Sequence, residues 1–260
     1  MEADDIIQHG ETRPSEQPTG TSVAADAVTF SYPGGTAVLS DLTFDIKPGE
    51  TVAIVGPTAS GKSTMVSLLA RLWDPSQGAI HLDGRDLREF AERGVAAEVT
   101  IVPQEAFLFN LSVRDNITLG QEFSDDDIRA AADLAQATPF VEELPDGFDT
   151  IVGEQGATLS GGQAQRIALA RSIIRKPRLL ILDDATSAID PSVETAILTG
   201  LRDAELPSTV VIVAYRQASI ALADRVVLVN EGRIAATGTH EELLASEPVY
   251  SEILTAYADV

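Results

Sequence analysis

The sequence contains no cysteine, few basic residues and no long apolar run. Without cysteine, the chain forms no disulfide and offers no thiolate to a metal ion. Its apolar runs are short, such as residues 210–214 and 226–229, and none approaches the roughly 18 to 20 residues that span a bilayer. These short runs predict buried parallel strands instead.

Basic residues are outnumbered: 18 Lys and Arg stand against 40 Asp and Glu, so the formal net charge is −22. This balance argues against a chain whose main work is to neutralise nucleic-acid phosphates, and we expect no nucleic-acid partner. Residues 121–149 hold nine acids and one base. Two interpretations of this stretch stay open, a solvated helix face, which is the simpler one, and a surface for a basic partner.

The first 22 residues are polar and lack the basic-then-apolar order of a signal peptide. We therefore expect a flexible leader or linker over residues 1–22 and a cytosolic location.

Hydrophobic patterning predicts an α/β fold with a helical insertion. Short β-type segments at 27–30 and 42–46, separated by a turn, suggest an antiparallel edge. The other expected strands are 50–55, 178–184, 209–215 and 224–234, and the expected helices are 63–72, one beginning at Ser124, 162–174, 192–202, 217–221 and 241–257. The expected organisation is a core of residues 23–104 and 177–240, a helical insertion of residues 105–176 and a C-terminal helix within residues 241–260.

A phosphate-binding loop is expected at Gly56, Pro57, Thr58, Ala59, Ser60, Gly61, Lys62 and Ser63, which match G-x-x-x-x-G-K-[ST] between a strand and a helix. The two glycines let the backbone turn so that its N–H groups point at phosphate oxygens. Lys62 supplies a charge near the β and γ phosphates, and Ser63 reaches magnesium.

Two further motifs lie downstream. Ser160, Gly161, Gly162 and Gln163 open an expected helix, and such a helix N-terminus makes a second phosphate-binding surface. Two phosphate sites far apart in one sequence suggest two chains that share nucleotides. A buried strand then delivers Asp183 and Asp184, and the first carboxylate is expected to hold the magnesium of a bound nucleotide.

In order and spacing, these motifs resemble the nucleotide-binding domain of an ATP-binding cassette (ABC) transporter over residues 23–258. The resemblance implies a P-loop NTPase (RecA-like) core with an antiparallel β subdomain and an inserted α-helical signature subdomain, with ATP and Mg²⁺ as ligands. It implies that Tyr32 stacks on adenine, and that Gln104 contacts magnesium and transmits motion to a membrane domain. Residues 56–64, which end at Thr64, correspond to the Walker A loop, residues 159–163 to the signature, Asp183 to Walker B and residues 187–190 to the D-loop.

The phrases at residues 102–117 and 150–163 resemble the exporter-type branch, which includes a minority of importers. There, residues 153–156 would touch the coupling helices of a transmembrane domain, fused or separate, at the cytoplasmic face of the membrane. Members of this branch commonly carry that domain ahead of the nucleotide-binding domain. We therefore favour the interpretation that residues 1–22 are a linker left when a longer, fused protein is cut. The alternative is that Met1 is a natural start.

The chain departs from the family pattern at two catalytic positions. Asp184 stands where a catalytic Glu is usual, and one missing methylene, about 1.5 Å, withdraws the base from the attacking water. Tyr215 stands where the switch histidine is usual, and a phenol cannot carry the charge of an imidazole. The pattern resembles the degenerate-site half of a heterodimeric transporter, whose intact signature serves the active site of a partner domain with Glu and His.

Two other classes of function stay open. A soluble superfamily member that acts on DNA or ribosomes usually carries coiled-coil insertions or tandem cassettes, which 260 residues do not accommodate. A regulatory nucleotide-binding protein that never turns over is favoured locally by Asp184 and Tyr215. The transported substrate is not readable, because selectivity lies in membrane domains.

Overall fold

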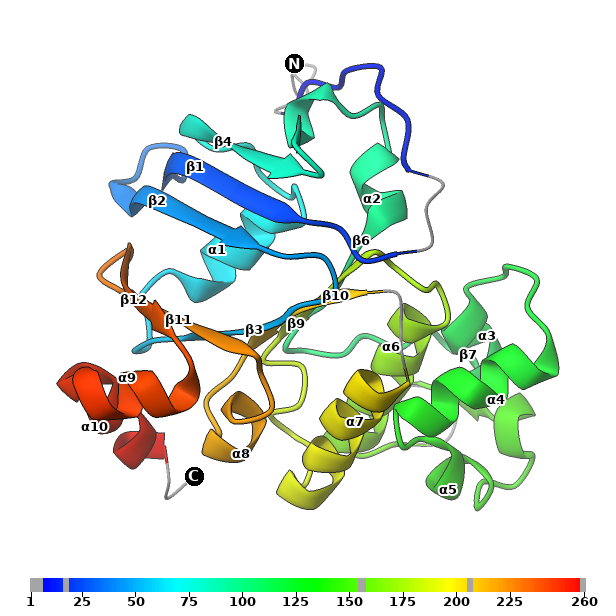
Figure 1. Cartoon of the computed structure of the whole chain (residues 1–260). Coiled ribbons are helices and arrows are strands. Elements are labelled where there is room, and N and C mark those ends of the chain that lie inside the picture. The colour runs from blue at the N-terminus through cyan, green and yellow to red at the C-terminus, as the bar shows by residue number, and fades with distance from the viewer. Residues whose placement is uncertain (1–6, 16–18, 154–157, 205–207, 258–260) are drawn as a thin grey trace. The chain divides into compact units, whose positions relative to one another are not determined.

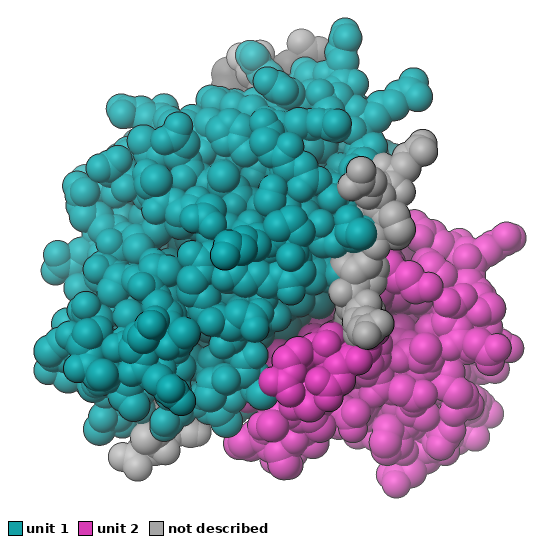
Figure 2. Space-filling view, in the orientation of Figure 1, with its two compact units in different colours: residues 1–100, 178–183, 207–260 teal, residues 101–177, 184–206 magenta. Residues whose placement is uncertain are grey.

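The computed structural model describes residues 7–15, 19–153, 158–204 and 208–257. The chain divides into two compact units (Figure 2). Unit 1 comprises Met1–Thr100, Arg178–Asp183 and Pro207–Val260, and unit 2 comprises Ile101–Pro177 and Asp184–Leu206. None of the helices in the described ranges is long and apolar enough to cross a bilayer.

A mainly parallel sheet of six strands forms the centre of unit 1 (Figure 1). Its order is β12-β11-β3-β10-β9-β6. The strands are β3 (Thr51–Val55), β6 (Val99–Val102), β9 (Leu179–Asp183), β10 (Thr209–Val213), β11 (Arg225–Asn230) and β12 (Arg233–Gly238). Strands β3, β9, β10 and β11 are rich in Val, Ile and Leu and are mostly buried, as expected for parallel strands covered on both faces.

The register of β3, β9 and β10 brings the carboxyl ends of these three strands to one edge of this sheet. Val213 at the end of β10 pairs with Asp183 of β9 and with Ile54 of β3, all in parallel. The carboxyl ends of these strands therefore lie side by side, and the residues that follow them project from the same edge.

A second sheet of unit 1 is antiparallel, with order β2-β1-β4-β5. Its strands are β1 (Val23–Ser31), β2 (Ala37–Ile46), β4 (Gln77–Leu82) and β5 (Arg85–Asp86). Helix α1 (Lys62–Leu69) runs between this sheet and the parallel one (Figure 1). The remaining helices of unit 1 are η1 (Leu87–Glu89), α2 (Gly94–Glu98), α8 (Gln217–Ile220), α9 (His240–Ser246) and α10 (Pro248–Tyr257).

The segment ahead of β1, expected to be a flexible leader, is hydrogen-bonded to unit 1 over part of its length. Gly10 N and Thr12 N donate to the carbonyls of Phe90 and Glu89, each at 2.9 Å. Ser15 N donates to the Glu98 carboxylate at 2.6 Å. These bonds give residues 10–15 fixed partners that no sequence periodicity indicates.

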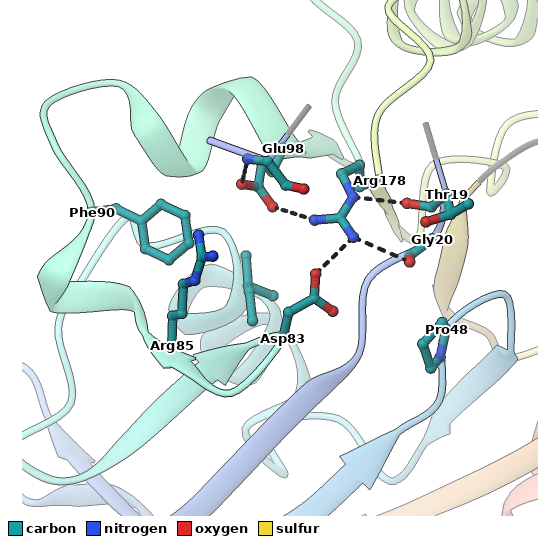
Figure 3. Close-up of a pocket in the computed structure, with 10 residues that line it drawn as sticks. Thr19, Gly20, Pro48, Asp83, Arg85, Phe90, Glu98 and Arg178 are labelled. Atoms are coloured by element: carbon teal, nitrogen blue, oxygen red, sulfur yellow. Dashed lines mark hydrogen bonds and ion pairs between the residues drawn. The ribbon is translucent and has the colours of Figure 1, made fainter. Parts of the chain in front are cut away.

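A buried ion pair anchors the same region (Figure 3). Arg178 and Glu98 are 6% and 2% exposed, and their side chains meet at 3.0 Å. Arg178 also donates to Asp83 at 2.7 Å and to the carbonyl of Thr19 at 2.8 Å. The guanidinium group thus has charged and carbonyl partners on several sides, as a buried charge requires.

Unit 2 is mainly helical. Its elements are β7 (Leu111–Ser112), α3 (Val113–Thr118), α4 (Asp125–Leu134), α5 (Thr138–Val141), η2 (Gly147–Asp149), β8 (Ile151–Val152), α6 (Gly161–Ile173) and α7 (Pro191–Asp203). Ser124 caps α4 by accepting a hydrogen bond from Asp127 N, and three acids fill the first turn of that helix. Both features are typical of a helix N-terminus, where side-chain oxygens and negative charge are favourable.

The terminal helix expected over residues 241–257 is two helices in the structure. Helix α9 ends at Ser246, and α10 begins at Pro248. Glu247 between them has an extended backbone, with φ −115° and ψ 99°. A residue before proline is disfavoured in the helical region, so the break has a local cause.

Candidate nucleotide-binding site

The phosphate loop lies between β3 and α1 in unit 1, at the edge where β9 and β10 also end. Gly61, immediately before α1, has a φ of +104°, which side chains of L-residues rarely adopt. A Cβ there would lie 2.6 Å from the Leu39 side chain. The positive φ favours glycine at this position, so Gly61 lets the loop turn into α1.

Lys62, the first residue of α1, is 4% exposed. Its ammonium group donates to the carbonyl oxygens of Gly56 and Pro57, each at 2.8 Å. The same nitrogen lies 5.0 Å from the centre of the Tyr215 ring, within the range of a cation–π interaction. Tyr215, which is expected at the switch position, therefore contacts the lysine of the phosphate loop.

Ser63 and Asp183 form a pair of oxygen ligands. The Ser63 hydroxyl donates to Asp183 Oδ1 at 3.2 Å. Burial raises the pKa of the Asp183 carboxyl above its ordinary value, while the Ser63 hydrogen bond and the Lys62 charge lower it in part. Hydroxyl and carboxylate oxygens are ligands that Mg²⁺ prefers, and a divalent cation would favour the ionised carboxylate, so these residues fit a magnesium site.

An aromatic cluster surrounds Tyr32. Its ring meets Phe30 and Trp73 edge to face, with centroids 4.9 Å and 5.4 Å apart. Its hydroxyl lies 3.2 Å from the hydroxyl of Thr64 in α1. Tyr32 is 38% exposed, so the cluster fixes the ring and leaves part of it open to a ligand. Sequence reasoning missed Trp73, which belongs to no recognised motif.

The boundary between the units falls between Asp183 and Asp184, and unit 2 holds the remaining predicted site residues. Gln104 Nε2 donates to Asp184 Oδ2 at 2.8 Å. Asp184 has a φ of +51°, uncommon for a residue other than glycine but tolerated by Asp. Ser187 N then donates to the Asp184 carbonyl at 3.2 Å, so the chain turns tightly after Asp184.

The motif at residues 160–163 begins helix α6. Ser160 and Gln163 form a capping box: Gln163 N donates to Ser160 Oγ at 3.2 Å, and Ser160 N donates to Gln163 Oε1 at 2.9 Å. This arrangement fixes the first turn of a 13-residue helix. Residues 154–156 of the expected coupling loop lie outside the described residues.

A cavity of about 280 Å³ in unit 1 contains no residue of the phosphate loop. It is lined by Arg178, Glu98 and the segment ahead of β1, among others (Figure 3). The cavity therefore belongs to the region around the buried Arg178–Glu98 ion pair. We assign the candidate site by the phosphate loop and its neighbours.

Comparisons with known proteins agree with this assignment. The sequence profile of the family described as "ABC transporter" matches residues 39–187, more than half of the chain. A mitochondrial potassium channel ATP-binding subunit from Pongo abelii is 43% identical over 249 residues, 94% of this chain and 34% of that protein. An ATP-dependent lipid A-core flippase from Alkalilimnicola ehrlichii is 43% identical over 248 residues, 94% of this chain and 42% of that protein.

A solved structure of a bacterial Atm1-family ABC exporter with ATP bound has a TM-score of 0.89 and 37% identity. The match covers 98% of this chain and 46% of that one. The chain thus spans less than half the length of these relatives.

Strand, phosphate loop and helix, with a carboxylate at the end of a neighbouring strand, define a P-loop nucleotide-binding domain. The chain belongs to the ABC transporter family, and the relatives named above include exporter-type proteins. The predicted α/β P-loop NTPase fold is confirmed.

Proposed function

We propose that this chain is the ATP-driven half of an exporter-type transporter whose own site binds ATP and hydrolyses it slowly. The observation that carries the proposal is the pairing of two departures from the family pattern. Asp184 is one methylene shorter than the usual Glu, and Tyr215 replaces the usual His and lies against Lys62. Misplacement of a catalytic group by about 1 Å costs on the order of a hundredfold in rate.

In this proposal each residue of the site has a defined task. Tyr32 stacks on adenine, and the phosphate loop with Lys62 holds the phosphates. Ser63 and Asp183, with Gln104, would hold Mg²⁺, which supplies positive charge to the β and γ phosphates. Asp184 is the weakened base that orients the attacking water.

A second nucleotide-binding domain, of a different chain, is the proposed partner. The two domains would pair head to tail, so that Ser160, Gly161, Gly162 and Gln163 serve the partner's nucleotide. The support is that the departures fall on Asp184 and Tyr215, while the signature is intact and its helix is capped. A partner with Glu and His at the matching positions would carry most of the turnover.

A transmembrane domain, fused or separate, is the second proposed partner and places the chain at the cytoplasmic face of the membrane. Unit 2 carries exposed apolar side chains that could contact such a domain. They are Phe107, Phe109, Leu111 and Ile151, which are 43% to 65% exposed. Arg171 donates a hydrogen bond to the carbonyl of Phe107, and the Asn116 side chain donates one to the carbonyl of Phe109. Rigid, exposed aromatic rings are typical of interaction surfaces.

The alternative is a regulatory nucleotide-binding protein that never turns over. Steady-state ATP turnover by the purified chain and by the Asp184→Glu, Tyr215→His double variant decides between these functions. We expect the double variant to be faster by tenfold or more. A parent as fast as the double variant would refute the slow site, and two proteins that bind ATP but stay inactive even when paired with a second nucleotide-binding domain would favour the regulator.

A further inference from the structure

Three segments of unit 2 meet at one buried amide, the side chain of Gln165 in helix α6. Gln165 is 4% exposed. Its Nε2 donates to the main-chain carbonyl of Gln104 at 2.9 Å and lies 3.3 Å from the Ser187 hydroxyl. Its Oε1 accepts a hydrogen bond from Ala188 N at 3.0 Å. These partners are 61, 22 and 23 residues away in sequence.

The chemistry of this position requires an amide. One end of the side chain faces a carbonyl oxygen and must donate, while the other end faces an N–H and must accept. Glutamine supplies both functions, whereas an ionised glutamate only accepts. Because the side chain is buried, a missing partner would leave a polar group unsatisfied.

These bonds close a ring that includes Asp184. Gln104 is held through its carbonyl by Gln165, and its own side chain donates to Asp184 Oδ2 at 2.8 Å. The hydroxyl of Ser187, three residues after Asp184, accepts a hydrogen bond from Gln165 Nε2. One side chain therefore links the main chain of Gln104 to Ser187, which lies three residues after Asp184.

Close packing supports the ring at the start of α6. A Cβ added to Gly162 would lie 2.5 Å from the Ala188 carbonyl oxygen, so the D-loop backbone passes directly against this turn. The first turn of α6 at Gly162 and the D-loop at Ala188 are therefore closely packed.

We propose that Gln165 is a positioning residue for ATP turnover, because it holds Gln104 in the arrangement that keeps its hydrogen bond to Asp184. The inference rests on the proposed ATPase function and adds to it a residue outside the recognised motifs. Gln165 would act through Gln104, without contact to nucleotide.

The test compares Gln165→Glu and Gln165→Met with the parent 260-residue chain. The first keeps the size and the acceptor but loses the donor, and the second removes both without burying a charge. Radiolabelled ATP measures turnover, and titration measures the Kd for ATP. We expect turnover to fall on the order of tenfold while the Kd changes less than about twofold. Gln121→Glu, the same change at an exposed position of unit 2, should match the parent.

A double-variant cycle separates positioning from a general structural role. In a Gln104→Ala background, the side chain that Gln165 positions is gone, so Gln165→Met should lower turnover by less than about twofold. Reductions that multiply in the double variant would overturn the inference, as would unchanged turnover in both Gln165 variants. If Gln165→Glu fails to fold, Gln165→Met decides the result. A parent with no turnover would refute the proposed ATPase together with the inference, whereas an active parent insensitive to Gln165 would overturn the inference alone.

Discussion

The ammonium nitrogen of Lys62 lies 5.0 Å from the centre of the Tyr215 ring. The lysine is buried, so the negative face of the ring contributes to the stability of its charge. Tyr215 thus has a structural contact of its own, in addition to its proposed place at the switch position.

Replacing Tyr215 with Ala should lower the free energy of unfolding by about 1 to 2 kcal/mol, because the partly desolvated cation–π contact is lost. Tyr215→Phe keeps the ring and should lose less stability than Tyr215→Ala. Urea denaturation of both variants checks the expectation. Equal stabilities for the Ala and Phe variants would mean that the ring does not stabilise Lys62.

Tyr32→Ala should weaken ATP binding by about 1 to 3 kcal/mol, the usual contribution of a base stacked on an aromatic ring. Tyr32→Phe removes only the hydroxyl that lies 3.2 Å from Thr64 and should bind nearly as well as the parent. Calorimetric titration with ATP measures both. If Tyr32→Ala kept the parental Kd, the adenine platform would have to lie elsewhere.

Glu98→Gln should destabilise unit 1 by about 1.5 to 3 kcal/mol, because the buried Arg178 loses one charged partner while Asp83 remains. A matched control is Arg202→Gln, which breaks a pair whose side chains are 53% and 65% exposed. That change should cost less than about 1 kcal/mol. Similar losses for the two variants would contradict the anchoring role of the Arg178–Glu98 pair.

Tyr250 makes the stability of unit 1 sensitive to alkaline pH. Its side chain is fully buried, its hydroxyl lies 2.7 Å from His240 Nδ1, and burial raises the pKa of the phenol to about 12. The unfolded chain releases this proton near pH 10, so the folded state loses stability as the pH rises from about 10 to 12. Tyr250→Phe should show a shallower loss over that window in denaturation measured at several pH values. Identical slopes for parent and variant would contradict the raised pKa.

The sequence predicts those parts of the molecule that depend on neighbours in the chain. The phosphate loop, its flanking strand and helix, and the cap at Ser160 are encoded within a few residues, and all are present. The strand expected over residues 224–234 is instead the hairpin of β11 and β12. Glu231 and Gly232 form its two-residue turn, both with positive φ, as a type I′ turn requires.

The features that sequence reasoning missed depend on partners far apart in the chain. Arg178 meets Glu98 across 80 residues, and Gln165 meets Gln104 across 61. Neither residue belongs to a periodic pattern that marks it, because a polar residue at a buried position has the same local sequence signature as one at the surface. Only the folded chain identifies their partners.

We propose that the site formed by this chain's own phosphate loop holds ATP without prompt hydrolysis. The most direct measurement is the identity of the nucleotide retained after the chain is incubated with Mg²⁺ and ATP, then separated from free nucleotide and denatured. We predict mainly ATP on the parent and mainly ADP on the Asp184→Glu, Tyr215→His variant. Retention of mainly ADP by the parent would contradict the claim.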